Sequence, residues 1–213
     1  MNSVESQYIL GMAGTVAFAV TAVLAVTPKG IDLFGACIMG LITAIGGGTI
    51  RDLILEVPVF WASDLNYIWV ALASSIVAFY GNRLLLKKNV YQLMLYVDAL
   101  GVSMFAIQAA QKVYGLYFAM PLGPILLGLL TAIGGGVIRD MMSGSPTLLM
   151  RKELYAVPVT IGCILYMVLT TCLPGNDITI GLSCVVFTFT FRAAAIHWKL
   201  SVPDWMQLHT KTD

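Results

Sequence analysis

A stretch of thirteen residues that occurs twice constrains the fold of this chain more than any other feature. It reads GLITAIGGGTIRD at 40–52 and GLLTAIGGGVIRD at 128–140, so only two of the thirteen positions differ. In both copies an apolar run leads into three glycines, and an arginine and an aspartate follow after two intervening residues. Each glycine in a helix costs roughly 1 kcal/mol relative to alanine. The triplets therefore predict two helices that break at the glycines.

The hydropathy of the chain indicates a membrane protein. Of 213 residues, 59% are hydrophobic and only 11% are charged, and both values depart from those of a soluble domain. Seven segments approach the roughly 20 residues that a spanning helix needs. They cover residues 6–28, 33–50, 65–82, 89–111, 113–138, 154–176 and 178–198. We therefore expect an all-α integral membrane protein with seven transmembrane helices, of which helices 2 and 5 are broken at Gly-Gly-Gly.

The sequence repeat extends beyond the glycine motif. Pro58 and Tyr67 recur 88 positions later, and Gly14-x3-Phe18-Ala19 recurs 87 positions later as Gly101-x3-Phe105-Ala106. These matches predict a single transmembrane domain (1–213) with repeats at about 8–86 and 91–173, a seventh helix at about 178–196 and a short cytoplasmic tail at 197–213. Because three helices make up each repeat, the second repeat must run inverted relative to the first. Inverted repeats are typical of many transport proteins.

The distribution of basic residues predicts the orientation. With the N-terminus outside, ten of the twelve Lys and Arg residues lie on the cytoplasmic side, and only Arg51 and Lys112 face outward. Such an excess on the cytoplasmic side is the usual bias of membrane proteins. We therefore expect a multi-pass protein of the cell (inner) membrane with a cytoplasmic C-terminus.

The glycine triplets are the first candidates for an ion pathway. Where a helix breaks in lipid, its freed backbone groups must find partners in protein or in a water-filled cavity. The freed carbonyls carry the negative end of the helix dipole and suit a monovalent cation, whereas the amides of the following half-helix suit an anion or a carboxylate. The sequence leaves the sign of the solute open, and a cation is the leading interpretation. The candidate residues are Gly46, Gly47, Gly48, Gly134, Gly135 and Gly136, with the hydroxyls of Thr43 and Thr131 one turn earlier.

Charged side chains inside the spans are the second set of candidates, because burying a charge in a bilayer costs at least a few kcal/mol. Arg51, Asp52, Arg139 and Asp140 fit either a structural Arg–Asp network between the repeats or a pore-lining gate. Since neighbouring residues point about 100° apart on a helix, we expect Arg51 to pair with a carboxylate other than Asp52. Asp98 fits ion attraction, protonation-linked gating or a bond to a neighbouring helix.

Two further charges, Lys112 and Arg192, lie near helix ends and are expected to extend toward the membrane surface. The sequence argues against several other classes of function. Both histidines lie in the predicted tail (197–213), and we find no nucleophile motif, no phosphate-binding loop and no Cys/His set with metal-ligand spacing. A formal net charge of +1 gives no support for nucleic-acid binding. We therefore expect no enzyme activity, no cofactor and no bound metal beyond passing monovalent cations.

The doubled Gly-Gly-Gly-x-Ile-Arg-Asp motif in a chain of seven spans resembles the bacterial and archaeal members of the trimeric intracellular cation (TRIC) channels, also catalogued as glycine transporters. The resemblance covers nearly the whole chain. It implies a homotrimer in which each protomer has its own pore, bounded by kinked helices 2 and 5, that conducts potassium and, less selectively, sodium. By this resemblance, the residues expected at the pore are the two glycine triplets and the Arg-Asp pairs that follow them. The Lys-Glu-Val-Gly-Arg pattern with which animal members bind lipid is absent, so phosphoinositide dependence is not expected.

Three classes of function follow from these observations. The leading hypothesis is a monovalent-cation channel gated by rearrangement at the glycine breaks. The alternative is a secondary carrier of a small zwitterion such as glycine. A scaffold without permeation would explain the hydropathy but not the duplicated motif.

Overall fold

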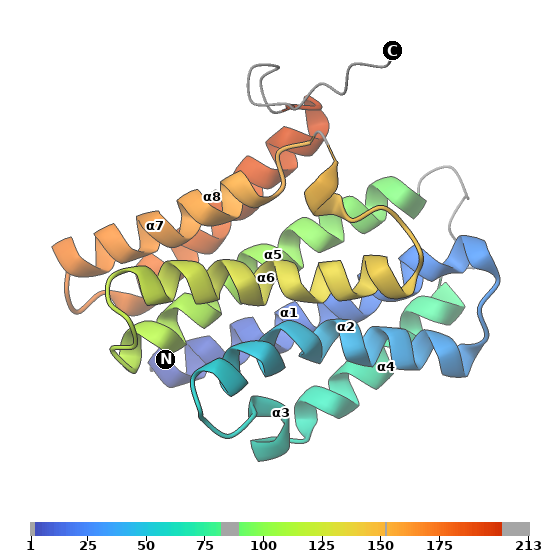
Figure 1. The fold of residues 1–213 in the computed structure, drawn as a ribbon, viewed down its shortest axis with the longest axis horizontal. Helices are drawn as coiled ribbons and strands as arrows, with labels where there is room; N and C mark the ends of the chain where they lie inside the picture. Colours follow the sequence, from blue (N-terminus) through green and yellow to red (C-terminus); the bar gives the residue numbers. More distant parts are fainter. Residues whose placement is uncertain (1–2, 82–89, 152, 202–213) are drawn as a thin grey trace, which may run out of the picture.

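The structure, a computed structural model, describes residues 3–81, 90–151 and 153–201. It is all-helical within these ranges, and Figure 1 shows the long helices lying side by side as a bundle. The α-helices are α1 (Ser3–Val26), α2 (Leu33–Ile54), α3 (Phe60–Ser63), α4 (Asn66–Gly81), α5 (Val90–Gly115), α6 (Leu122–Met142), α7 (Ala156–Cys172) and α8 (Asp177–His197). Two short 3₁₀ helices, η1 (Thr27–Lys29) and η3 (Leu148–Met150), lie in connections.

Five of these helices, α1, α2, α5, α6 and α8, are long and apolar enough to cross a membrane. The other two predicted spans correspond to the apolar helices α4, of which the structure describes 16 residues, and α7, which has 17. The predicted end of the third span at 82–86 lies outside the described residues. One boundary was predicted wrongly: the fifth span was expected over 113–138, but α5 continues to Gly115 and α6 begins at Leu122 after a series of turns. Pro121 explains the late start, because the residue before a proline disfavours helical geometry.

The predicted helix breaks are wrong. Both glycine triplets lie inside uninterrupted α-helices, since α2 continues to Ile54 and α6 to Met142. The physical reason is the contact between these helices: a Cβ added to Gly47 would lie 2.1 Å from the carbonyl oxygen of Thr131, and one on Gly135 would lie 2.5 Å from that of Thr43. Glycines allow the two backbones to touch, whereas a broken helix would leave backbone groups without partners in lipid. The expected tight helix contact is found, and the expected ion site of freed carbonyls is not.

As with Gly47 and Gly135, equivalent positions elsewhere in the two predicted repeats make matching contacts with the other repeat. The missing side chain of Gly14 faces the ring of Phe105, and that of Gly101 faces the ring of Phe18. These four residues are the α1 and α5 positions that match at a spacing of 87. In Figure 1, α2 and α6 run side by side in opposite directions, as do α1 and α5. Such exchange of equivalent contacts is what a twofold axis between inverted copies produces. The largest part of the buried core includes Phe18, Phe105 and Ala132, which come from α1, α5 and α6.

Candidate functional site

The first charged cluster, named here the Arg51 centre, joins the C-terminal end of α2 to α5. Arg51 donates from Nε to Asp52 Oδ1 at 2.8 Å and from Nη1 to the amide oxygen of Gln108 at 2.9 Å. The Lys112 ammonium reaches the same Asp52 Oδ1 at 2.7 Å. Asp52 Oδ2 accepts the backbone N–H of Phe60 at 2.9 Å, which fixes the segment after α2. One buried carboxylate therefore has two cationic partners.

The second cluster, the Arg139 centre, lies at the C-terminal end of α6 and repeats part of this pattern. Arg139 donates from Nε to Asp140 Oδ1 at 2.9 Å, and Asp140 Oδ2 accepts the N–H of Leu148 at 2.9 Å. The Nη1 group of Arg139, however, binds a carboxylate, Asp98 Oδ1 on α5, at 2.6 Å. Two buried carboxylates here share one arginine. The two centres lie beyond the glycine crossing in opposite directions, because α2 and α6 are antiparallel (Figure 1).

The pairing within each Arg-Asp dipeptide contradicts the expectation that Arg51 would bind another carboxylate. The backbone N–H eight residues later draws each aspartate toward the segment after the helix. The long arginine side chain then curls back so that its Nε reaches the neighbouring carboxylate. The angle of about 100° between adjacent side chains therefore did not predict the pairing, because both side chains bend away from their radial directions.

Asp98 is fully buried and bonded to Arg139 on α6, so the structure places it in the bond to a neighbouring helix that was one of its three interpretations. Arg192 was predicted wrongly as a side chain that extends toward the membrane surface. Lys112, of which the same was expected, keeps 24% of its side chain exposed while its ammonium binds Asp52. Arg192 on α8 is fully buried, donates to the carbonyl oxygen of Leu154 at 3.0 Å and stacks over Tyr155 at 4.8 Å. Arg192 and Lys112 therefore bind a carbonyl oxygen, an aromatic ring and a carboxylate of the protein, where contact with water alone was expected.

The two threonines before the triplets are buried but play different parts. The Thr131 hydroxyl donates to the carbonyl oxygen of Leu127 within α6 at 2.6 Å. The Thr43 hydroxyl has no hydrogen-bond partner among the residues that the structure describes. Only Thr43 thus keeps a hydroxyl available for another group at the crossing of α2 and α6.

Several buried side chains at and near the Arg139 centre have polar atoms without a hydrogen-bond partner among the described residues. Asp98 Oδ2, Arg139 Nη2, the hydroxyl of Tyr155 and the Nε and Nη2 groups of Arg192 have no partner within the described part of the chain. A Cβ built on Gly136 would lie 2.8 Å from the Tyr155 hydroxyl and 3.6 Å from both Arg139 Nη2 and Asp98 Oδ1. Three polar side chains therefore converge on the third glycine of the triplet.

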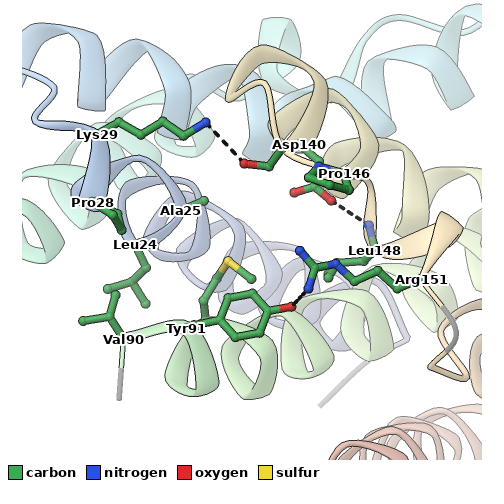
Figure 2. Close-up of a pocket in the computed structure, with 12 residues that line it drawn as sticks. Leu24, Ala25, Pro28, Lys29, Val90, Tyr91, Asp140, Pro146, Leu148 and Arg151 are labelled. Carbon is green, nitrogen blue, oxygen red and sulfur yellow. Dashed lines mark hydrogen bonds between the residues drawn. The ribbon is translucent and has the colours of Figure 1, made fainter. Parts of the chain in front are cut away.

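A pocket of about 270 Å³ opens beside the Arg139 centre, between the end of α1, the start of α5 and the loop after α6. Figure 2 shows Asp140 and Lys29 on its walls, with Arg151 and Tyr91 on the opposite side. The Lys29 ammonium contacts the Ser145 hydroxyl at 3.4 Å, and Arg151 donates to the Tyr91 hydroxyl and stacks over its ring. Much of the remaining lining is apolar, from residues such as Leu24 and Met94.

Several residues of these sites were not predicted from the sequence. Four residues that contact the two centres or the pocket were not among the candidate site residues: Gln108, Lys112, Tyr155 and Lys29. Gln108 carried a usable signal, since a polar amide in an apolar span needs a partner. No group of three or more His, Cys, Asp or Glu side chains that could hold a metal is found in the described ranges.

The chain resembles known proteins over nearly its full length. The family model for glycine transporters matches it twice, at residues 8–83 and 95–171. A UPF0126 membrane protein of Vibrio cholerae is 36% identical over 201 residues, covering 93% of this chain and 82% of that protein. The UPF0126 inner membrane protein YadS of Escherichia coli is 34% identical over 200 residues, covering 93% and 95% of the two chains.

Solved structures agree with these sequence matches. A crystal structure of the trimeric intracellular cation channel orthologue from Rhodobacter sphaeroides has a TM-score of 0.84 and 30% identity, covering 91% of this chain and 98% of that one. A prokaryotic TRIC channel crystallised in 0.5 M KCl also has a TM-score of 0.84, with 28% identity and coverage of 92% and 98%. A trimeric intracellular cation channel of C. elegans, at 16% identity and a TM-score of 0.64, shares the fold.

Proposed function

Because this chain belongs to the TRIC family, which is also catalogued as the glycine transporter family, we propose that it is a cation channel of the inner membrane. The observation that carries the proposal is its likeness, over almost the whole length of both chains, to a solved structure described as a cation channel. The matched family consists of membrane channels, so we propose no enzyme activity and no cofactor.

The permeant ion in this proposal is potassium and, less selectively, sodium, and each protomer of a homotrimer contains its own path. We place the path between α2 and α6 with their neighbours α1 and α5, where the Arg51 and Arg139 centres lie on opposite sides of the glycine crossing. The crossing is the narrowest point, because the two backbones touch there. Conduction then needs α2 and α6 to separate, and the unpaired Thr43 hydroxyl offers an oxygen to an ion at that level.

Within the proposed arrangement the chain has seven spans, in two inverted repeats followed by α8, with the N-terminus outside and the C-terminus in the cytoplasm. The Arg51 centre then faces outward, and the Arg139 centre with its pocket faces the cytoplasm. The arginines do not repel cations as free charges would, because Asp52, Asp98 and Asp140 neutralise them. The Arg-Asp pairs thus combine a structural role with a place at the ends of the path.

Reconstitution of the purified protein in a planar bilayer tests this proposal. We expect discrete conductance steps whose reversal potential follows the potassium gradient. Gly47→Leu combined with Gly135→Leu should abolish the steps, because both side chains would press on backbone carbonyls of the opposite helix. Insertion of this variant is checked by its yield in the membrane fraction. Unchanged flux through a correctly inserted double variant would contradict the proposed path.

A second function, transport of a small zwitterion such as glycine, is favoured by one observation. Asp98 Oδ2 is a free acceptor, and Arg139 and Arg192 keep free donors, all buried and without partners among the described residues. Unpaired acceptor and donor atoms of this kind complement an ammonium and a carboxylate, although Asp98 and Arg139 are themselves ion-paired. Saturable glycine uptake into proteoliposomes without conductance steps would favour this carrier over the channel.

A further inference from the structure

Polar bonds join the two halves of the bundle at the Arg51 centre. The first half comprises α1 to α4, and the second comprises α5 to α7. Lys112 on α5 reaches Asp52 on α2 at 2.7 Å, and Gln108 on α5 accepts a hydrogen bond from Arg51 on α2 at 2.9 Å. Arg51, Asp52 and Gln108 are buried, and Lys112 is mostly so. Two bonds, one of them an ion pair, therefore cross between the halves at this end.

At the Arg139 centre, the side chains that bind the arginine belong to its own half of the bundle. Arg139 and Asp140 are on α6, and Asp98 is on α5. Within the described part of the chain, the polar side-chain contact found across the halves near this end joins Lys29 Nζ to Ser145 Oγ at 3.4 Å. Lys29 is exposed, and the distance is long for a hydrogen bond. The two halves are therefore held together much more weakly at this end.

The sequence explains why the two ends differ. The spacing of 87 that relates α1 to α5 makes Ala25 the counterpart of Lys112 and Thr21 the counterpart of Gln108. Ala25 has no polar group to offer, and the Thr21 hydroxyl donates to the carbonyl oxygen of Phe18 within α1 at 2.8 Å. The first half therefore lacks the two side chains that would repeat these bonds at the Arg139 centre.

A cavity separates the halves where these bonds are missing. The pocket of about 270 Å³ beside the Arg139 centre lies between them, because its walls include Leu24 and Ala25 from α1 and Tyr91 and Met94 from α5 (Figure 2). Protein interiors are otherwise closely packed. The interface between the halves is thus bonded at the Arg51 end and hollow at the Arg139 end.

We propose that Lys112 and Gln108 lock the closed state of the protein by holding α5 to α2. This inference rests on the proposed channel, in which conduction needs α2 to separate from α6. A Cβ added to Gly128 on α6 would lie 2.9 Å from the carbonyl oxygen of Ala106 on α5, so α6 and α5 are closely packed. Because α5 is bonded to α2, the crossing of α2 and α6 widens fully only after both bonds of the lock break. Lys112 and Gln108 are positioning residues in this proposal.

Single-channel recording in a planar bilayer tests the lock. Lys112→Met should raise the open probability about fivefold at an unchanged unit conductance, since a partly exposed ion pair shifts an equilibrium by about this factor. Lys112→Arg keeps the charge and should keep the low open probability. Lys29→Met is the matched control, because it removes the ammonium that contacts the other half at the Arg139 end. It should leave the open probability almost unaltered.

Gln108→Leu provides a second variant, which removes the other bond of the lock without changing the charge. It should also raise the open probability. The proposal is overturned if Lys112→Met and Gln108→Leu both leave the open probability unaltered, or if Lys29→Met raises it as much as Lys112→Met does. A change in unit conductance without a change in open probability also overturns it, because Lys112 would then line the path.

Hydrogen exchange of the full-length protein in detergent separates the lock from the channel, because exchange reports local opening without permeation. In Lys112→Met, backbone exchange should rise on both sides of the interface, in residues 55–63 and 108–115, and stay unaltered in α7, the reference for global unfolding. Lys112→Arg should show no rise. This pattern in a protein that passes no current would support the lock and eliminate the channel. Currents together with unaltered exchange in Lys112→Met would eliminate the lock and leave the channel.

Discussion

The contact between α2 and α6 predicts that two glycines from the two copies of the motif, Gly47 and Gly134, respond oppositely to the same substitution. A Cβ at Gly47 would lie 2.1 Å from the Thr131 carbonyl oxygen and 3.1 Å from its carbonyl carbon. A Cβ at Gly134 would have the Cα of Gly47 as its nearest neighbour, at 3.4 Å, which is an ordinary contact. Gly47→Ala must therefore push two backbones apart, whereas Gly134→Ala needs no movement.

The expected magnitudes follow from overpacking and helix propensity. Overpacking costs about 1–3 kcal/mol, and the upper end applies at Gly47 because the opposing atoms are backbone and cannot rotate away. The change from glycine to alanine in a helix returns about 1 kcal/mol. Gly47→Ala should thus destabilise the protein by about 2 kcal/mol, or about 4–8 °C at about 2–4 °C per kcal/mol. Gly134→Ala should be neutral or stabilising by up to about 1 kcal/mol.

Thermal unfolding of the purified variants in one detergent measures this difference. Gly135→Ala is a further check, since its Cβ would lie 2.5 Å from the Thr43 carbonyl oxygen, and it should behave like Gly47→Ala. Equal shifts for Gly47→Ala and Gly134→Ala would refute the close crossing of uninterrupted helices. A destabilising Gly134→Ala would favour broken helices, in which the glycines serve backbone conformation instead of contact.

Three further predictions concern the charged centres, each measured by the same unfolding assay. Asp98→Leu should lower the free energy of unfolding by about 3–5 kcal/mol, because Arg139 loses a buried carboxylate. Gln108→Leu removes only a neutral acceptor from Arg51 and should lower it by about 1–3 kcal/mol. Equal losses of stability in the two variants would argue against the charge pairing. Tyr155→Phe should be neutral or stabilising because the removed hydroxyl is buried without a partner among the described residues, so a loss above about 1 kcal/mol would reveal a ligand or water on it. Lys112→Met should lower stability by about 1 kcal/mol through its lost bond to Asp52, and an unaltered melting temperature would show that this ion pair contributes nothing.

The sequence by itself determined the membrane class, the duplicated motif and the family. Apolar runs of spanning length exclude a soluble fold, and the thirteen-residue repeat pairs α2 with α6. It also predicted that the triplets line a cavity or a tight helix contact instead of facing lipid, on the argument that freed backbone groups need partners, and the contact between α2 and α6 confirms the tight helix contact.

Only the tertiary structure decided how the motif is used. Helix propensity predicted breaks at the glycines, but contact between the backbones of α2 and α6 offsets that local cost and keeps both helices whole. The position of Arg192 near a helix end suggested contact with water, yet the side chain is fully buried and donates to the carbonyl oxygen of Leu154. Which polar groups meet depends on how distant helices pack, and a single sequence records local preferences but not those distances.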